Sequence, residues 1–160
     1  MIAVDPGMEI RAFRAEDTPF ALEAFRGNLP EFFAAHELQE YQDFLGRLEA
    51  GELGALRYLT VVQGGAPRAF GGWFKRQEPG AGGLCWGLVA RSHHRQGLGS
   101  ALLAVRLGEM ALECERCVLD TTPRSFGFYR RFGFVQTEHI ADGYAPGLDK
   151  VLAELVFTEP

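Results

Sequence analysis

Residues 89–103 read Val89-Ala90-Arg91-Ser92-His93-His94-Arg95-Gln96-Gly97-Leu98-Gly99-Ser100-Ala101-Leu102-Leu103. An apolar strand ends here, a polar loop follows, and two glycines precede an amphipathic helix. The first N–H groups of a helix have no internal partner, and the helix dipole adds positive charge there. Since glycines let an anion approach the backbone closely, this stretch predicts a site for a phosphate or diphosphate. The alternative is a glycine-rich helix start without a ligand.

Two other phosphate-binding motifs do not fit this stretch. A Walker loop requires a Gly-Lys pair, and the sequence contains none. A dinucleotide fingerprint requires a third glycine three residues after Gly99, where Leu102 stands.

The remaining sequence predicts one mixed α/β domain over residues 1–160, without a linker or an internal repeat. Strands are predicted at 8–14, 58–62, 69–75, 84–89, 117–121, 134–138 and 151–157. Helices are predicted at 18–27, 36–47, from Leu98 onward and at 125–132. Gly64-Gly65 predicts a hairpin, and residues 77–83 and 142–147 predict loops.

Two of these helices carry more detailed expectations. Thr18 is the expected N-cap of the first helix, with Pro19 in its first turn. The helix from Leu98 should bury one apolar face. That face is formed by Leu98, Ala101, Leu102, Val105 and Leu112.

Composition narrows the class of protein. Sixteen basic and 21 acidic residues give a formal charge of −5, which argues against a broad nucleic-acid or anionic-membrane surface. No stretch approaches the ~18 apolar residues of a membrane helix, and Asp5, Glu9 and Arg11 interrupt any signal-like run. Three cysteines suit reduced thiols, so we expect a cytoplasmic protein. Cys114 and Cys117 form a lone CxxC, which we interpret as packing residues rather than a metal site.

A second informative segment is Leu119-Asp120-Thr121-Thr122-Pro123-Arg124-Ser125-Phe126-Gly127-Phe128-Tyr129-Arg130-Arg131-Phe132-Gly133-Phe134. Five aromatic residues within nine positions usually indicate core, but on a short helix they cannot all face inward. A tyrosine beside a cleft has a phenol that can donate a proton. Composition alone leaves both readings of Tyr129 open, core residue and proton donor.

Both segments resemble the GNAT acetyltransferase family. His94-Arg95-Gln96-Gly97-Leu98-Gly99 is similar to its diphosphate motif Q/R-x-x-G-x-G/A, with His94 where Gln or Arg is usual. Phe128-Tyr129-Arg130-Arg131-Phe132-Gly133-Phe134 resembles its F/L-Y-x-x-x-G-F segment. The order of the expected elements also agrees with the family, so the resemblance covers nearly the whole chain.

The resemblance implies a fold and a co-substrate. The fold is α/β, with a single mixed, mostly antiparallel twisted sheet of about seven strands flanked by about four helices. The co-substrate is acetyl-CoA, and no metal is implied. The residues expected to contact acetyl-CoA are Leu88, Val89, His94, Arg95, Gln96, Gly97, Leu98, Gly99, Ser100, Thr122, Ser125, Phe128, Tyr129 and Arg131. Thr122 stands where the family often has Asn, and Arg131 stands where a basic residue can approach the 3′-phosphate.

The resemblance also implies catalytic roles. Tyr129 is expected to protonate the leaving thiolate, and a backbone N–H near Leu88-Val89 is expected to stabilise the oxyanion. Many members place a Glu on the fourth strand, but residues 84–89 contain no carboxylate. His36, Glu37 and Asp120 remain as candidate bases, and Glu37 is our catalytic candidate on the acceptor side.

We therefore expect an acetyl-CoA-dependent N-acetyltransferase acting on a primary amine of a small molecule. One alternative is an enzyme that acetylates a peptide or protein amine. Another is a non-catalytic acyl-CoA-binding regulatory module. No nucleic-acid or membrane partner is expected, and a homodimer is left open.

Overall fold

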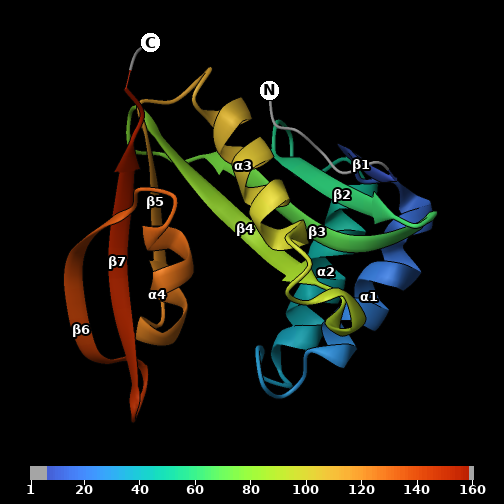
Figure 1. Ribbon diagram of the computed structural model, residues 1–160, viewed down its shortest axis with the longest axis horizontal. Helices are drawn as coiled ribbons and strands as arrows, with labels where there is room; N and C mark the ends of the chain where they lie inside the picture. Colours follow the sequence, from blue (N-terminus) through green and yellow to red (C-terminus); the bar gives the residue numbers. More distant parts are fainter. Residues whose placement is uncertain (1–6, 159–160) are drawn as a thin grey trace. The chain divides into compact units, whose positions relative to one another are not determined.

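The computed structural model describes residues 7–158, so Asp5 lies outside the described residues. Figure 1 shows the elements in chain order. The strands are β1 (Met8–Ala12), β2 (Arg57–Gln63), β3 (Ala66–Lys75), β4 (Ala81–Val89), β5 (Arg116–Thr121), β6 (Val135–Ala145) and β7 (Leu148–Val156). The helices are α1 (Thr18–Gly27), α2 (Glu37–Glu49), α3 (Leu98–Met110) and α4 (Pro123–Arg130), with short 3-10 turns η1 (Ala15–Asp17) and η2 (Arg91–His93).

The strands form one seven-stranded sheet in the order β1-β2-β3-β4-β5-β7-β6. β4 and β5 run parallel, with Ala81 opposite Arg116 and Gly82 opposite Cys117. The pairs β1–β2, β2–β3, β5–β7 and β6–β7 are antiparallel. This mixed, mostly antiparallel sheet with four α-helices confirms the predicted fold class.

Contacts divide the chain into two compact units, which are described separately. The first comprises Met1–Phe74 and Cys85–Arg106, and the second comprises Lys75–Leu84 and Leu107–Pro160. β4 and α3 therefore contribute residues to both.

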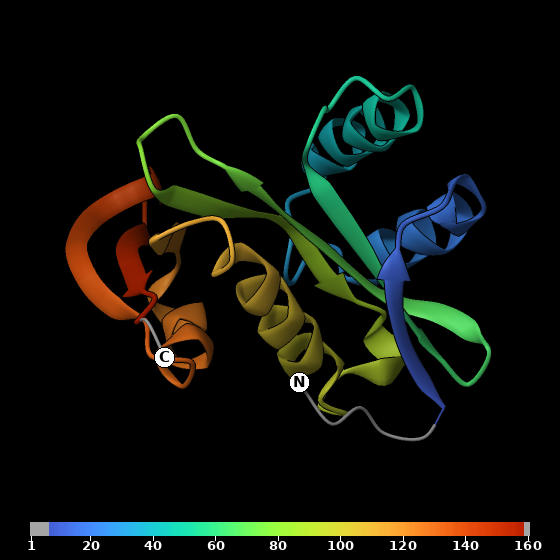
Figure 2. The ribbon, with the colours of Figure 1, turned by 90° about the horizontal axis from the view of Figure 1, so that it is seen from above.

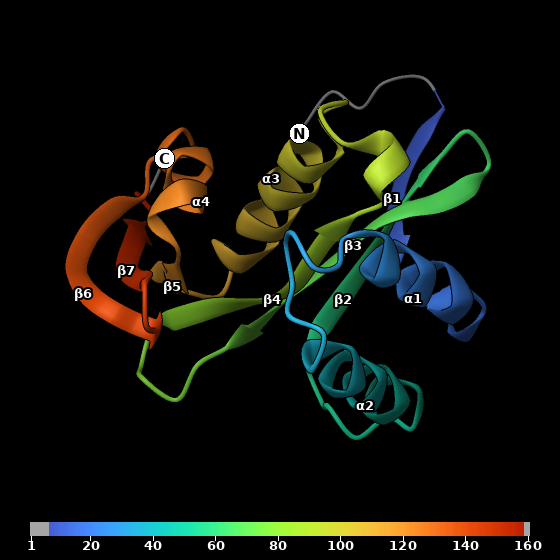
Figure 3. The same cartoon turned by 90° about the horizontal axis from the view of Figure 1, so that it is seen from below.

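In the first unit, helices cover both faces of the strands. Figures 2 and 3 show α1 and α2 on one side of β1–β3 and α3 on the other. Successive β2 residues point to opposite faces. Accordingly Tyr58 packs in the cluster with α1 and α2, whereas Leu59 and Val61 pack with Leu98 and Leu102 of α3. Covered on both faces, the centre of β2 is buried without interruption.

A buried carboxylate connects β1, η1 and β2 in the same unit. Asp17 is 2% exposed and accepts bonds from Arg11 at 2.7 and 2.9 Å, from the Arg14 N–H at 2.9 Å and from Thr60 Oγ1 at 2.9 Å. Burial raises the pKa of Asp17, but these bonds and the Arg11 charge outweigh it, so the pKa lies below its ordinary 3.8.

In the second unit, α4 packs beside β7, as Figure 1 shows. Cys117 and Leu119 of β5 and Val151 and Ala153 of β7 supply the buried strand positions. The last turn of α3 also belongs here. It lies so close to β4 that a Cβ at Gly82 would be 2.4 Å from Met110 Sδ. Glycine at position 82 therefore permits this close packing.

The structure corrects four local predictions. The N-cap of α1 is Asp17, not Thr18, because η1 already leads into the helix. Leu112 is 86% exposed because α3 ends at Met110, two residues earlier. The turn predicted to end at Gly83 gives way to β4 at Ala81.

The fourth correction concerns residues 142–147, predicted as a loop. β6 extends to Ala145, although its register with β7 shifts between Ile140 and Ala145. Asp142 has a left-handed φ of 54°, and its N–H donates to Asp149 on β7 at 2.9 Å. The glycine, proline and aspartate of this segment accommodate an irregular strand pair, and their composition alone resembles a loop.

Asp17→Asn should destabilise the protein at neutral pH by about 3 kcal/mol, because it removes the charge that compensates Arg11. The stability from a carboxylate with a lowered pKa is present above the unfolded-state pKa and is lost as the pH falls through the folded-state pKa. Urea unfolding between pH 7 and pH 3 should therefore show a flatter stability curve in the variant. The exposed neighbour Glu16 provides the control, and Glu16→Gln should follow the parent curve. If the free energy of unfolding depends on pH equally in the parent and in Asp17→Asn, the Asp17 carboxylate does not have this stabilising role.

Candidate functional site

The predicted site residues fall into two groups. Glu37, Leu88, Val89 and residues 94–100 belong to the first unit, and Thr122, Ser125, Phe128, Tyr129 and Arg131 belong to the second.

The turn between β4 and α3 has the backbone geometry expected of an anion site. Arg95 and Gly97 have left-handed φ angles of 62° and 81°, directly before α3 begins at Leu98. Turns with left-handed residues can aim successive N–H groups into one concavity, where they attract anions. Arg95, Gln96 and Gly97 are exposed, whereas the Leu98 side chain is buried in the core. Leu98 can therefore contact a ligand at this turn only through its backbone.

Glycine suits position 97 because of its backbone conformation, not because a side chain would lack space. No atom lies within 4 Å of the position a Cβ would occupy there. A β-branched residue at a φ of 81° would nevertheless be strained by roughly 1–2 kcal/mol.

The His94 side chain holds this turn to the end of β4. Its Nε2 lies 2.9 Å from the carbonyl oxygen of Val89, and its ring meets Phe32 edge-on at 5.3 Å. Because a carbonyl only accepts, His94 Nε2 carries the proton. The same carbonyl accepts a 2.9 Å bond from Nδ2 of the buried Asn28. His94, which stands where the family motif usually has Gln or Arg, thus has a structural role here.

A second connection joins the turn to the segment before α2. Arg91 Nη2 lies 2.6 Å from Glu31 Oε2, and both side chains are largely exposed. The predicted catalytic Glu37 is the first residue of α2, and its Oε1 accepts a 2.9 Å bond from the Ala34 N–H. This bond closes the turn that precedes the helix, as an acidic residue in a first turn commonly does.

Within β4, the backbone departs from a regular strand at Trp86, which sequence reasoning missed. Trp86 has a φ of 40°, an outlier for a bulky residue that costs of order 1–3 kcal/mol. Cys85, Trp86 and Leu88 all pack in the cluster with α1 and α2, whereas Val89 packs with α3. Two consecutive residues on one face are the mark of a β-bulge. No local sequence signal, such as a glycine at position 86, indicates it.

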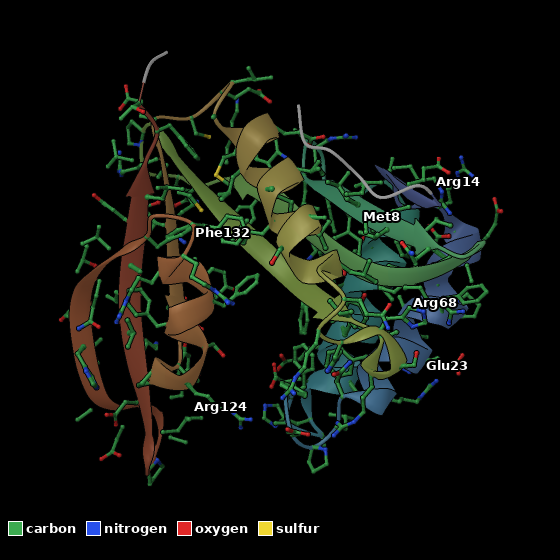
Figure 4. All side chains as sticks on the ribbon, viewed as in Figure 1. Met8, Arg14, Glu23, Arg68, Arg124 and Phe132 are labelled. Carbon is green, nitrogen blue, oxygen red and sulfur yellow. The ribbon has the colours of Figure 1, made fainter. Side chains whose placement is uncertain are left out.

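In the second unit, α4 presents the predicted aromatic segment. Figure 4 labels Arg124 in its first turn and Phe132 just beyond its last. Thr122 is the N-cap, and its Oγ1 accepts a 3.2 Å bond from the Ser125 N–H. Thr122, which replaces the family's frequent Asn, thus starts the helix.

The aromatic side chains of this segment divide into two groups. Phe126 and Phe134 are buried and fix the segment to the unit, whereas Phe128, Tyr129 and Phe132 are half-buried. The Tyr129 ring meets Phe134 edge-on at 5.8 Å. Arg131 is exposed, with its guanidinium 5.7 Å from the centre of the Phe128 ring. Tyr129 therefore has a fixed ring while part of its surface stays open.

Asp120, one of the candidate bases, is bound by a tyrosine. The Tyr144 hydroxyl donates to Asp120 Oδ2, and Lys150 Nζ lies 4.9 Å from the centre of the Tyr144 ring. Burial raises the pKa of Tyr144, and the bond to Asp120 and the charges of Asp120 and Tyr129 raise it further. Tyr144 therefore stays protonated near neutral pH and is the donor in its hydrogen bond to Asp120.

The cysteines do not have the character of nucleophiles. Burial raises the pKa of Cys85 to about 12, so this thiol is neutral near pH 7. Cys114 and Cys117 are buried and form no disulfide. Among residues 7–158, no group of three or more His, Cys, Asp or Glu side chains is placed to hold a metal ion. Within the same range, no helix is both long and apolar enough to cross a membrane.

The sequence matches the family model described as the acetyltransferase (GNAT) family over residues 19–134. No curated protein sequence matches the chain at a significant level.

Solved structures share the fold at low sequence identity. A protein assigned to the GNAT family from Desulfovibrio desulfuricans is 20% identical, with a TM-score of 0.81 over 93% of this chain and 98% of its own. YncA from Salmonella typhimurium, solved with acetyl-CoA, is 18% identical, with a TM-score of 0.78 over 97% and 96%. The ribosomal-protein-S18-alanine N-acetyltransferase from Escherichia coli is 16% identical, with a TM-score of 0.75 over 96% of each chain.

Proposed function

The chain belongs to the acetyltransferase (GNAT) family and is therefore an acyltransferase, and we propose that it transfers the acetyl group of acetyl-CoA to a primary amine of a small molecule. The observation that carries the co-substrate assignment is the turn with left-handed Arg95 and Gly97 at the start of α3. It supplies backbone N–H groups and the positive end of a helix dipole, which suit a diphosphate. The similar Salmonella protein was solved with acetyl-CoA, which supports the same co-substrate here.

In this proposal the diphosphate lies on the backbone of residues 95–100, and Ser100 can add its hydroxyl. Leu88 and Val89 of β4 present backbone groups to the pantetheine and the thioester. In the second unit, Thr122, Ser125, Phe128 and Tyr129 of the α4 segment contact the rest of the coenzyme. The exposed guanidinium of Arg131 pairs with the 3′-phosphate.

The reaction breaks the thioester C–S bond and forms an amide C–N bond. The attacking amine must be neutral, but a lysine-like amine with a pKa of about 10.4 is neutral in only about one molecule in two or three thousand at pH 7. A carboxylate that receives the proton, directly or through water, therefore helps the reaction. The tetrahedral oxyanion needs a fixed donor, and a β4 backbone N–H near Leu88-Val89 supplies it. Donors of this kind are typically worth about 2.7–4 kcal/mol.

The leaving thiolate takes the proton of the Tyr129 hydroxyl in this proposal. A free thiol has a pKa of about 8.5, so protonation assists the departure without being indispensable. The half-buried Tyr129 ring, held between Phe128 and Phe134, supports this role because its position is fixed. The Tyr41 and Tyr58 hydroxyls do not suit proton transfer near neutral pH, because burial raises both pKa values strongly.

Two carboxylates are candidates for the acceptor ammonium. Glu37 is the one we propose, because the bond from Ala34 engages its Oε1 and fixes the carboxylate at the start of α2. Asp120, held by the Tyr144 hydroxyl in the second unit, is the rival. Either carboxylate could attract a cationic amine.

Two alternatives to a small-molecule N-acetyltransferase remain, and they have different tests. The similar E. coli enzyme acts on a ribosomal-protein alanine, which supports a protein amine as the rival acceptor. A non-catalytic acyl-CoA-binding module is the other rival, since β4 lacks a carboxylate. Thiol release from acetyl-CoA should be measured over polyamines, aminoglycosides, amino-acid amides and N-terminal peptides. Turnover with peptides alone would favour the first rival, and tight binding without thiol release would favour the second. A cytoplasmic location is part of the proposal and is supported by the free thiols.

Gly97→Val should lower the affinity for CoA at least about tenfold, because the valine cannot keep a φ of 81° without strain and the N–H groups of the turn move. Isothermal titration calorimetry measures this change. Gly64 provides a matched control, with a φ of 62° and no atom within 4 Å of its missing Cβ. Gly64→Val imposes similar strain in the β2–β3 hairpin and should leave the CoA affinity unchanged. A folded Gly97→Val protein with the parent affinity would place the diphosphate elsewhere.

Tyr129→Phe should lower kcat by about 10- to 10⁴-fold, because it removes the proton donor while keeping the ring contacts. The affinity for CoA should change little. Steady-state thiol release between pH 6 and pH 9 measures the effect. An unchanged kcat throughout this range would mean that water protonates the thiolate.

Glu37→Gln should raise KM for a cationic acceptor by about two- to fivefold, the size expected for one partly exposed charge pair. The amide oxygen can still accept the Ala34 bond, so the helix start is preserved. KM for a neutral aromatic amine and the CoA affinity should not change. Glu40→Gln, at an exposed position on the same helix, is the charge-matched control. If Asp120→Asn produces the rise in KM and Glu37→Gln does not, the role belongs to Asp120.

A further inference from the structure

The bulge at Trp86 lies just before the β4 residues that the proposed function assigns to the thioester. Gly87 faces the α3 side of the strand, since a Cβ there would lie 3.3 Å from Arg106 Nη2. Leu88 and Val89 then continue to opposite faces. Because peptide groups are planar, a change in φ at Trp86 rotates the N–H groups that follow it. The direction of the Gly87, Leu88 and Val89 N–H groups therefore depends on how firmly Trp86 is held.

One buried hydroxyl holds the Trp86 backbone. Tyr58 of β2 is 4% exposed, and its hydroxyl donates to the Trp86 carbonyl oxygen at 2.7 Å. Tyr41 of α2, which is fully buried, lies 2.8 Å from the same hydroxyl. Because the Tyr58 proton is committed to the carbonyl, Tyr41 is the donor to Tyr58. The order of donation is therefore Tyr41 to Tyr58 to Trp86.

The Trp86 side chain is held separately, by aromatic rings. The centre of its ring lies 5.1 Å from the ring centre of Tyr41, 6.0 Å from that of Phe25 and 6.2 Å from that of Phe44. These contacts use ring faces and edges, which a tyrosine-to-phenylalanine change preserves. The hydroxyl contact to the carbonyl can therefore be removed without removing the ring contacts.

We propose that Tyr58 is a positioning residue, whose hydroxyl fixes the strained bulge at Trp86 and so aims the β4 N–H near Leu88-Val89 at the thioester carbonyl. This inference rests on the proposed function, since it names the residue that orients the oxyanion donor. Burial raises the pKa of both tyrosines, so the chain of donors persists over the pH range of an acetyl-transfer assay. Tyr58 acts through the backbone and does not touch the substrate.

The matched pair Tyr58→Phe and Tyr41→Phe tests the proposal. Each variant loses one hydroxyl from the same buried pair, but only Tyr58→Phe removes the bond to the Trp86 carbonyl. Misplacing a catalytic group by about 1 Å costs on the order of 100-fold in rate. We expect kcat to fall about 10- to 100-fold in Tyr58→Phe and to stay within about twofold in Tyr41→Phe. The affinity for CoA should change much less than kcat in both, because the diphosphate turn keeps its own contacts.

A spectroscopic readout separates positioning from a loss of stability. The chain contains two tryptophans, Trp73 and Trp86, so 5-fluorotryptophan labelling should give two fluorine resonances. The resonance that disappears in Trp86→Phe identifies residue 86. It should shift in Tyr58→Phe and remain at or near its parent position in Tyr41→Phe.

Equal falls in kcat for the two variants, or an unshifted Trp86 resonance in Tyr58→Phe, would overturn the proposal and leave Tyr58 with a stabilising role only. If the parent chain releases no thiol with any acceptor, the proposed function fails on that result alone. The fluorine resonance then still decides whether Tyr58 holds the bulge.

Discussion

The organisation of the first unit depends on two hydrogen bonds that the carbonyl oxygen of Val89 accepts. This carbonyl ends β4 and accepts one hydrogen bond from the Asn28 amide and one from the His94 ring. Asn28 follows α1 directly, and His94 begins the turn that leads into α3. One acceptor thus ties a strand end, a helix end and the turn before α3 together. Since it would be costly to leave this partly buried carbonyl without partners, the two bonds hold the three segments in one arrangement.

The backbone takes unusual conformations on both sides of this strand end. Toward the C-terminus, left-handed Arg95 and Gly97 shape the turn, and buried Leu98 holds the helix start to the core. Toward the N-terminus, the Trp86 bulge sets the direction of the last β4 peptide groups. The strand and its turn therefore differ from regular structure in two features of the backbone, the bulge at Trp86 and the left-handed residues of the turn. The strand itself contains no carboxylate.

In the second unit, the notable features are side chains of the α4 segment and of the neighbouring strands. Thr122 caps α4, buried Phe126 and Phe134 fix the segment, and Tyr129 keeps part of its surface open. Asp120 and Tyr144 form a polar pair across the strands, with Tyr144 remaining the proton donor. In the first unit, the Glu37 carboxyl group accepts a hydrogen bond from a backbone N–H just before α2.

The sequence by itself determined the features that depend on neighbouring residues. Strand alternation, the Gly64-Gly65 hairpin, the helix from Leu98 and the glycine turn could all be predicted, because period and backbone freedom are local properties. Only the tertiary structure decided the Asp17–Thr60 bond, the Asn28–Val89 bond and the Tyr41–Tyr58–Trp86 chain. These contacts join residues 17 to 61 positions apart, so no window of sequence contains both partners. Trp86 shows the reason most clearly. Its left-handed φ persists because surrounding rings and a hydroxyl from another strand hold it, and those neighbours come together only in the folded chain.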